Sequence, residues 1–484
     1  MAVAPAAVSA PTIPHDLEAY IEAERRRADV VGASVAAFDR DGMRFAGGFG
    51  YADLERGERV TPDTLFRAAS ISKLFTTTLV LQEIEAGRIG LDDPVNQYLD
   101  LRTRISDKHG APANDVTVRH LLTHTSGLPV SWKGIEQGPW FLRLAVNRGR
   151  LAVRSHVEVI EGMRTMRRPG RRIVYANGGF SLLGHRAERV NGEPFAGLVR
   201  RRVLEPLGMR NSGFPLDPGG EGVATPYRHA IRFTGAGRRP VGSIKNWSGP
   251  AGALLTSAPE LARFGQMVLG GGEVAGQRIL SESLLQQATS FQARNHPELD
   301  EGIGLGFWVS RYRGRSLVGH TGGLAGVATR LDILPEDGVG VVVLTNGADP
   351  FYVQRLAERV REMLLGLEPE AVPGLPAGMV PGTEAEWSAF TSRIAGKYRL
   401  QDMVPPGLLS AITGLVARPR LSPVRDGVLA MEGFGNEPGF LYPDGAVGRY
   451  RVAYPLGNGL RAVIEEKANG THLWTSIVHL FRPK

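Results

Sequence analysis

The residues best suited to chemistry are a serine and a lysine three positions apart. In LFRAASISKLFTTTLVLQEIEAGRIG, Ser70 and Lys73 form an S-x-x-K pair that opens a helical pattern ending near Gly87. Three residues make about one helical turn, so both side chains lie on one face. A serine hydroxyl is a poor nucleophile until a neighbour accepts its proton, and a lysine in a dry site has a pKa low enough to do so. The alternative is a capping serine beside a solvated lysine.

A tyrosine and an asparagine further along the chain add groups that would assist such a serine. Tyr175 and Asn177 form Y-x-N in VYANGGFSLLG, just before a second helical pattern. A phenol beside a lysine can share or relay its proton, as base for the attack and as acid for the leaving group. Asn177 can bind a substrate carbonyl. The alternative is a core tyrosine followed by a helix-capping asparagine.

A glycine-rich segment between two expected strands offers backbone donors. In LVGHTGGLAGVATRLDILP, His320 and Thr321 precede Gly322 and Gly323 at the end of one strand, before the turn into the next. Glycines there let a substrate approach the backbone closely, and exposed N–H groups can bind an oxyanion. The alternative is an ordinary glycine-rich hairpin.

The composition restricts which chemistry is open to the chain. Its 484 residues suffice for more than one domain, and 42% apolar with 22% charged residues support a packed core. Because there is no cysteine, disulfides, zinc ribbons, iron–sulfur clusters and thiol nucleophiles are excluded. A serine, a carboxylate or a cofactor must therefore do any chemistry. The net charge of +8 is small for this length, and we expect no nucleic-acid binding.

The start of the chain and its apolar runs bear on location. The segment MAVAPAAVSAPTIPHDLEAY has no basic region followed by a long apolar one, so it is not typical of an export signal. No run of 18 apolar residues occurs, and we expect no membrane span. A cytoplasmic location follows, unless a leader was replaced by Met1.

The hydrophobic pattern predicts the elements that must position these motifs. A helix over His15–Val30 precedes a hairpin of Gly32–Asp39 and Arg44–Asp53. Helical patterns dominate from Ser70 to about Gln287. Strand patterns return at Gly304–Ser310, Ser316–His320, Ala328–Pro335 and Gly338–Asn346, followed by a helix at Phe351–Leu365. This order predicts an α/β domain over residues 14–366, whose sheet comes from about 14–60 and 300–366 with helices between.

The last quarter of the chain has a different character. Residues 367–384 hold LEPEAVPGLPAGMVPG, whose prolines and glycines are typical of a linker. From Trp387 onward the pattern is mostly short strands and turns, including GVLAMEGF, GRYRVAY, LRAVIEE and HLWTSIVHLF. We expect a small β-rich domain over residues 385–484.

The three motifs, in the order S-x-x-K, Y-x-N and H-T-G within one domain, resemble the serine β-lactamase and penicillin-binding protein superfamily. The resemblance covers roughly Val31 to Glu362. It includes the segments TPDTLFRAASISKLFTT, VRHLLTHTSGLP, RPGRRIVYANGGFSLLG, AGALLTSAPELARF and GHTGG. It is closest to the branch with class C β-lactamases, family VIII esterases, D-amino-acid peptidases and amidases, and penicillin-binding-type thioesterases that cyclise peptides. The resemblance implies an antiparallel sheet flanked by helices with an all-helical insert.

The resemblance also implies a role for each motif residue. Ser70 would be the acylated nucleophile, Lys73 its proton acceptor and Tyr175 the second acid/base. The oxyanion hole would consist of the backbone N–H groups of Ser70 and Gly323. The substrate-binding residues would be Asn177 at the acyl amide, with His320, Thr321 and Gly322 on the side of the leaving group. No metal and no cofactor is implied.

One departure from the family pattern concerns His320. Penicillin-recognising members usually carry lysine there, which is charged near neutrality, whereas histidine is mostly neutral at pH 7. Recognition of a carboxylate should weaken. We therefore do not expect a dedicated β-lactamase.

Several residues near the motifs allow two interpretations. The ten basic residues between Val130 and Tyr175 either attract an anionic substrate or carrier protein, or form a solvated face. Trp132 and Trp140 either line an acyl pocket or belong to the core. His124 is expected to fix a loop. The C-terminal domain is similar to lipocalin-like barrels of this superfamily, and either walls the cleft or serves as a stabilising or dimerising appendage.

The sequence thus predicts a serine hydrolase that cleaves esters, or amides and peptides that include those of D-amino acids, through an acyl-enzyme on Ser70. One alternative is a thioesterase or transacylase that cyclises peptides, in which an amine replaces water and a carrier protein can deliver the acyl chain. A second is a catalytically silent binding protein. The partner is a small-molecule or peptide acyl substrate in the first reading, and the oligomeric state is left open.

Overall fold

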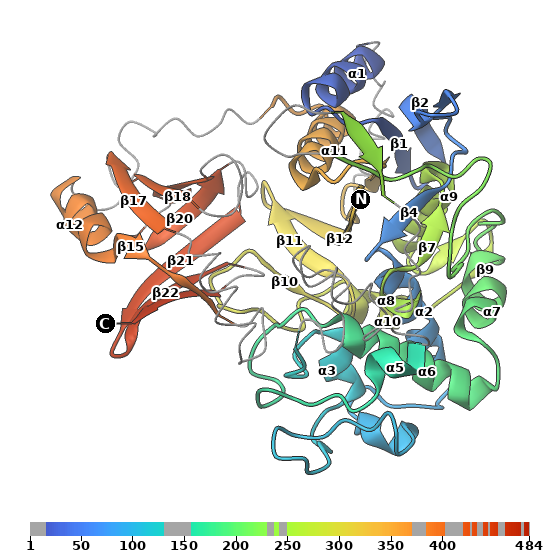
Figure 1. Cartoon of the computed structure of the whole chain (residues 1–484), viewed down its shortest axis with the longest axis horizontal. Helices are drawn as coiled ribbons and strands as arrows, with labels where there is room; N and C mark the ends of the chain where they lie inside the picture. The colour runs from blue at the N-terminus through green and yellow to red at the C-terminus, as the bar shows by residue number, and fades with distance from the viewer. Residues whose placement is uncertain are drawn as a thin grey trace, which may run out of the picture.

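A large antiparallel sheet forms the centre of the main domain (Figure 1). The computed structural model describes residues 16–129, 156–229, 237–241, 249–369, 384–401, 420–425, 428–432, 439–443, 446–453, 460–475 and 479–483. Within these ranges the sheet has eight strands in the order β10-β11-β12-β13-β14-β1-β2-β3. Their bounds are β1 Gly32–Asp39, β2 Met43–Asp53, β3 Glu58–Arg59, β10 Glu301–Ile303, β11 Trp308–Tyr312, β12 Arg315–Leu324, β13 Val327–Leu334 and β14 Val339–Thr345.

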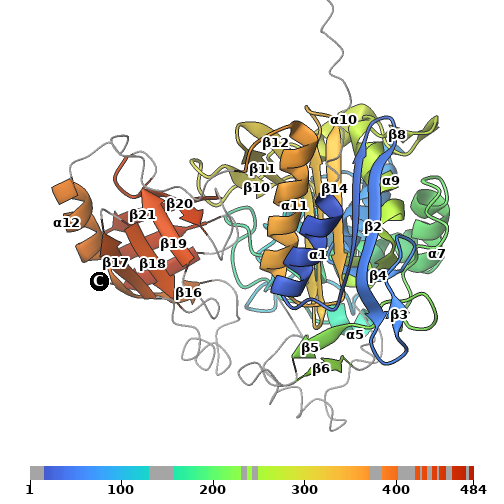
Figure 2. The same ribbon diagram turned by 90° about the horizontal axis from the view of Figure 1, so that it is seen from above.

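Both ends of this domain contribute to the sheet because the first strand pairs with the last. β1 lies between β2 and β14, with Val35 opposite Val343. Side chains alternate between the two faces of a strand, and here both faces are covered. Ala33, Val35 and Ala37 pack with helices α1 (Leu17–Arg27) and α11 (Pro350–Leu365), whereas Phe38 packs on the face of α9 (Ala258–Leu269). Figure 2 shows α1 and α11 on one face of the sheet and α9 on the other. The predicted fold class is confirmed.

The residues between the two halves of the sheet form a mainly helical insert. Its further helices are α2 Ser72–Glu85, η1 Val95–Tyr98, α3 Val118–Leu122, α5 His156–Ile160, α6 Asn177–Asn191, α7 Phe195–Val199, η4 Arg200–Leu204, α8 Gly249–Gly252 and α10 Glu282–Ala288. No helix in the described ranges combines the length and the apolar character needed to cross a membrane.

The insert is not all-helical, which corrects one detail of the expectation. Three two-stranded sheets interrupt it, namely β4 (Phe66–Ala69) with β7 (Leu254–Thr256), β5 (Tyr227–His229) with β6 (Arg238–Pro240), and β8 (Glu273–Val274) with β9 (Gln277–Arg278). These strands have two to four residues. That is too short for an alternating pattern to stand out in the sequence.

The strand predicted at Gly304–Ser310 exists in its second half only, as β11 (Trp308–Tyr312), because the chain turns before Trp308. β10 ends at Ile303 and β11 begins at Trp308. Gly306 adopts φ +77°, and a Cβ there would lie 1.9 Å from Thr77 Oγ1 on α2. Contact with this helix forces the turn, and only glycine permits it.

The C-terminal region is an antiparallel sheet preceded by a helix, α12 (Glu384–Ile394), which the sequence reading missed. Nine strands of the described residues follow the order β15-β17-β18-β19-β20-β21-β22-β23-β16. Their bounds are β15 Gly396–Lys397, β16 Arg399–Gln401, β17 Arg420–Arg425, β18 Val428–Glu432, β19 Gly439–Pro443, β20 Arg449–Ala453, β21 Leu460–Lys467, β22 Gly470–Trp474 and β23 His479–Pro483. Only Tyr398 separates the two edge strands in the chain, so the sheet curves until its edges approach each other.

The C-terminal sheet contacts the main domain through the loop that leads into β10. Leu299 packs against Val463 and Trp474. A hydrogen bond between His296 and Glu465 at 3.2 Å and an ion pair between Glu298 and Arg449 flank this apolar contact. Figures 1 and 2 place β21 on the side of the main domain that carries β10.

Candidate active site

Ser70 lies in a tight turn between a strand and a helix. β4 ends at Ala69, which has φ +51°, and α2 begins at Ser72. A non-glycine residue in the left-handed region is strained. Here the side chain of Ser72 stabilises the turn. The Ser72 hydroxyl donates to Ala69 O at 2.5 Å and accepts from Leu254 N–H at 2.9 Å. This turn leaves the Ser70 side chain half-buried, just before the first residue of α2.

Lys73 is fully buried, one helical turn from Ser70. Its ammonium Nζ lies 3.0 Å from Ser70 Oγ and 2.7 Å from the carbonyl oxygen of Ala251 on α8. No carboxylate among the described residues forms a salt bridge with it. Burial therefore holds the pKa of Lys73 well below its ordinary value, which favours the neutral amine that a base must be.

Tyr175 joins the pair from the segment before α6. Lys73 Nζ lies 4.8 Å from the centre of the Tyr175 ring. Burial raises the pKa of Tyr175, and the nearby Ser70 side chain opposes this shift only in part. The phenol therefore stays protonated and is suited to donating a proton.

His124 brackets Tyr175 from both sides. The N–H of Val174 donates to His124 O at 2.7 Å, and the N–H of Ala176 donates to His124 Nδ1 at 3.1 Å. The two rings lie 4.3 Å apart. Burial, and secondarily the charge of Lys73, hold the pKa of His124 well below its ordinary value, so this ring is neutral. It acts as a support for the tyrosine backbone, in keeping with the loop-fixing role expected from the sequence.

The glycine-rich segment is the end of β12, and it passes directly beside Ser70. A Cβ on Gly322 would lie 2.3 Å from Ala68 O and 3.1 Å from Ala69 Cβ, so only glycine fits there. Thr329 on β13 fixes the same point, because its hydroxyl donates to Ala68 O at 2.9 Å. Thr321 and Gly323 are exposed on this strand, and a Cβ on Gly323 would meet no atom within 4 Å.

His320 faces the same group of aromatic rings. It is 3% exposed, and its ring centre lies 6.1 Å from that of Tyr175. His320 Nδ1 donates to the carbonyl oxygen of Thr321 at 2.5 Å, which leaves Nε2 as an acceptor without a partner among the described residues. Burial, and then the charge of Lys73, lower the pKa of His320 to about 3. The imidazole is therefore neutral, as the sequence suggested.

Trp308 belongs to this group, and the sequence reading missed it. Its ring stacks on Tyr175 with centres 6.3 Å apart and lies at the same distance from His320. Trp308 pairs with Gly319 in the register of β11 and β12. A tryptophan on the strand next to His320 was the available signal, but the turn at Gly306 had to be known to set its position.

Of the remaining residues predicted to bind substrate, the structure describes Asn177 but neither tryptophan. Asn177 is the first residue of α6, two positions from Tyr175, and is half-buried. Trp132 and Trp140 lie outside the described residues, as does about half of the basic segment. Of the basic residues that are described, Arg172 lies 5.0 Å from the ring centre of Trp474 and so belongs to the contact with the C-terminal sheet.

A hydroxyl beside a buried neutral amine and a protonated phenol is the arrangement of a serine hydrolase that uses lysine as its base. Comparison with known proteins agrees with this class. The family model described as Beta-lactamase matches residues 17–365, and the chain belongs to that family.

Relatives of known sequence are distant and cover about 70% of the chain. Penicillin-binding protein 4 of Amycolatopsis lactamdurans is 28% identical in an alignment of 358 residues that covers 71% of this chain and 88% of that protein. Putative beta-lactamase-like 1 of Homo sapiens is also 28% identical, over 71% of this chain and 67% of that protein.

Two solved structures resemble the chain to different extents. A D-stereospecific amidohydrolase from Streptomyces sp. covers 70% of this chain and 97% of its own, with 27% identity and a TM-score of 0.58. The octameric penicillin-binding protein homologue from Pyrococcus abyssi covers 96% of this chain and 99% of its own, with 24% identity and a TM-score of 0.60. The second likeness shows the fold alone, and it extends over the C-terminal region.

The burial of Lys73 predicts how substitutions there act. Because only the neutral amine accepts a proton, wild-type acylation should be present above the lowered pKa of Lys73 and lost as pH falls through it. Lys73→Ala should lower kcat by about 10²–10⁴-fold, and Lys73→Arg, which stays charged, by as much at every pH. A pH–rate profile with an ester substrate measures both. The exposed Lys108→Ala is the matched control, and an active Lys73→Arg would exclude the amine as base.

Proposed function

We propose that this protein hydrolyses esters or amides of small acyl or amino-acid substrates, those of D-amino acids included, through an acyl-enzyme on Ser70. The single observation that carries the proposal is the contact of Ser70 Oγ with a fully buried Lys73 amine at 3.0 Å. The likeness to a D-stereospecific amidohydrolase at 27% identity supports the substrate class.

In the first step the Ser70 oxygen attacks the substrate carbonyl and its proton passes to Lys73 Nζ. The carbonyl oxygen becomes an oxyanion, for which the backbone N–H groups of Ser70 and Gly323 are the proposed donors. The close approach of Gly322 to Ala69 supports this assignment, because it brings β12 alongside the serine.

In the second step the tetrahedral intermediate collapses and the leaving group takes a proton from Tyr175. Lys73 then returns its proton to the tyrosine, so acylation ends with a neutral lysine, a protonated phenol and an ester on Ser70. Water repeats the sequence on that ester and releases the acid. Asn177, at the start of α6, is the proposed partner of the acyl amide.

The neutral His320 narrows the range of leaving groups. An imidazole whose Nδ1 proton is held by Thr321 O has neither a charge nor a free donor for a carboxylate. A leaving group that carries a free carboxylate next to the cleaved bond gains nothing there. Amines and alcohols without a free carboxylate, such as an amino-acid amide, are the leaving groups that this site favours.

The same chemistry extends to a transacylase or peptide-cyclising thioesterase if an amine reaches the acyl-enzyme before water. The choice depends on the shape of the cleft around the acyl chain, to which the two tryptophans outside the described residues are candidate contributors. Hydrolysis is the function we propose, and aminolysis is the second candidate.

The mechanism predicts a covalent intermediate. With p-nitrophenyl butyrate, the wild type should release one nitrophenol per active site in a burst, and intact mass spectrometry followed by peptide mapping should find one butyryl group on Ser70. Ser70→Ala should lose both, whereas the exposed Ser283→Ala should keep both. Equal turnover by Ser70→Ala would reject the mechanism, and binding of the ester without turnover by the wild type would favour a silent binding protein.

The proposed role of His320 predicts a change of substrate preference. His320→Lys adds a cation, and a charge-assisted hydrogen bond contributes about 1.5–3 kcal/mol. The ratio of kcat/KM for a D-dipeptide with a free carboxylate to that for the matching dipeptide amide should therefore rise about tenfold or more. His320→Gln, which adds no charge, is the control. An unchanged ratio in His320→Lys would show that residue 320 does not contact the leaving group.

The C-terminal sheet is proposed to wall one side of the cleft through Trp474. This side chain packs on Leu299 and lies under Arg172, three residues before Tyr175. Trp474→Ala should change KM for bulky acyl esters by several-fold while acetyl esters are little affected. Trp387→Ala, which removes the same ring from the α12 side of this sheet, is the control for lost stability. If Trp474→Ala and Trp387→Ala had the same effect on all esters, the C-terminal sheet would only stabilise the protein and would not contact the substrate.

A further inference from the structure

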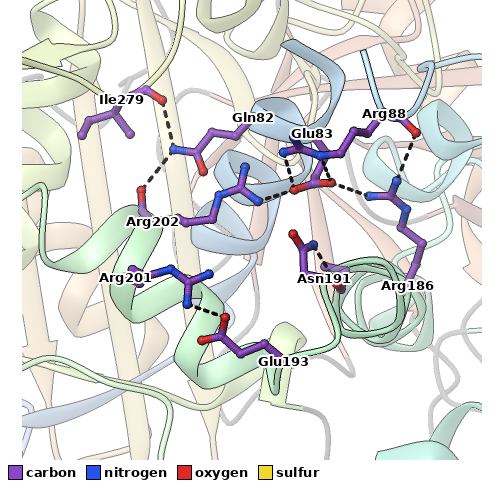
Figure 3. A network of polar contacts seen from close by, with 10 residues as sticks. Gln82, Glu83, Arg88, Arg186, Asn191, Glu193, Arg201, Arg202 and Ile279 are labelled. Atoms are coloured by element: carbon purple, nitrogen blue, oxygen red, sulfur yellow. Dashed lines mark hydrogen bonds and ion pairs between the residues drawn. The ribbon is translucent and has the colours of Figure 1, made fainter. Parts of the chain in front are cut away.

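A buried carboxylate at the far end of α2 gathers three arginines from other parts of the insert. Figure 3 shows Glu83 surrounded by Arg88, Arg186 and Arg202. Arg88 donates twice, at 2.7 and 2.9 Å, Arg186 donates at 3.4 Å, and Arg202 donates to the second oxygen. The mechanism above uses none of these residues.

This cluster is fixed in charge over the range of any assay. Burial raises the pKa of Glu83, but the hydrogen bonds of Arg88 and Arg202 outweigh it and lower the pKa to about 2. Glu83 and Arg186 are completely buried, whereas Arg88 and Arg202 reach the surface. Within this cluster, Glu83 and Arg186 are therefore the two residues that cannot replace each other by water.

The pair joins the two helices that carry the catalytic groups. Glu83 is ten residues beyond Lys73 on α2, a rise of about 15 Å, and Arg186 is nine residues beyond Asn177 on α6, a rise of about 13.5 Å. At the other end of the same two helices, Lys73 Nζ lies 5.7 Å from the ring of Phe180 in the first turns of α6. The two helices therefore contact each other twice, once at the active site between Lys73 and Phe180 and once between Glu83 and Arg186.

The short helix α8 contacts both α2 and α6, by hydrogen bonds on the side of α2 and by a close glycine contact on the side of α6. Thr76 donates to Pro250 O at 2.6 Å from the side of α2. On the side of α6, a Cβ on Gly184 would lie 2.1 Å from Pro250 Cγ, so the helix approaches α8 as closely as glycine allows. A flat glycine contact permits sliding along the axis, whereas a charged pair resists it.

We propose that Glu83 is a positioning residue for catalysis, because its pairing with Arg186 fixes the register of α2 against α6. This register decides whether the Lys73 amine, at the start of one helix, stays buried against Tyr175, just before the other. A slip of a fraction of a turn would admit water to the amine. The inference rests on the proposed function for its consequence in catalysis, but the geometry that it concerns is measurable without turnover.

The test compares wild type with Glu83→Gln and with the charge-balanced double variant Glu83→Gln/Arg186→Gln, which leaves no buried arginine unpaired. The pKa of Lys73 is read by NMR titration of ¹³C-lysine protein, which has seven lysines to assign. Labelling of Ser70 by a fluorophosphonate is followed over the same pH range. In the double variant we expect the Lys73 pKa to move up toward its ordinary value, the acid limb of labelling to shift to higher pH with it, and the maximal rate to fall about tenfold.

Glu362→Gln is the matched control, because Glu362 is a buried glutamate on α11 that pairs with Arg313 at 2.8 Å on the other face of the sheet. It should lower the melting temperature without moving the Lys73 titration. If the double variant also leaves that titration in place, or loses rate only in proportion to its unfolded fraction, the positioning role is overturned. A wild type that never labels at Ser70 would overturn the proposed function instead, while the NMR titration would still decide the role of Glu83.

Discussion

The chemistry of this site depends on the complete burial of the Lys73 amine, which pairs with no carboxylate in the part of the chain that the structure describes. An ammonium in such a place is costly, so burial holds the pKa of Lys73 well below its ordinary value and favours the neutral amine. The two histidines beside it remain neutral, and the phenol beside it stays protonated, for the same reason. One dry environment therefore sets the protonation state of every group around Ser70.

Keeping that environment dry requires elements from distant parts of the chain. β12 closes one side of Ser70 at the position where only Gly322 fits, and Trp308 and His320 cover Tyr175. His124 holds the tyrosine backbone by two hydrogen bonds. The large sheet serves these contacts because it carries β11 and β12 side by side, and both of its faces are packed.

Elements were predicted correctly where a helix or strand has a clear periodic pattern in its own sequence. The hairpin of β1 and β2, the strands β13 and β14, and the closing helix α11 follow from alternation and helical periodicity. Prediction failed where a contact between remote residues decides the backbone. Gly306 turns because α2 lies against it, and the short pairs β4–β7 and β8–β9 exist only where other elements hold them. The helix α12 was missed because its apolar residues, Trp387, Phe390 and Ile394, also suit short strands.

By itself the sequence determined which reactive groups the chain has, their spacing within one turn of helix, and the substitution of histidine for lysine in the third motif. Only the tertiary structure decided that Lys73 is dry, that His320 turns its proton toward Thr321, and that Glu83 pairs with Arg186 across two helices. The reason is physical. Spacing along a chain fixes the chemistry of a group, whereas its protonation state and its partners depend on the low-dielectric surroundings that folding alone assembles.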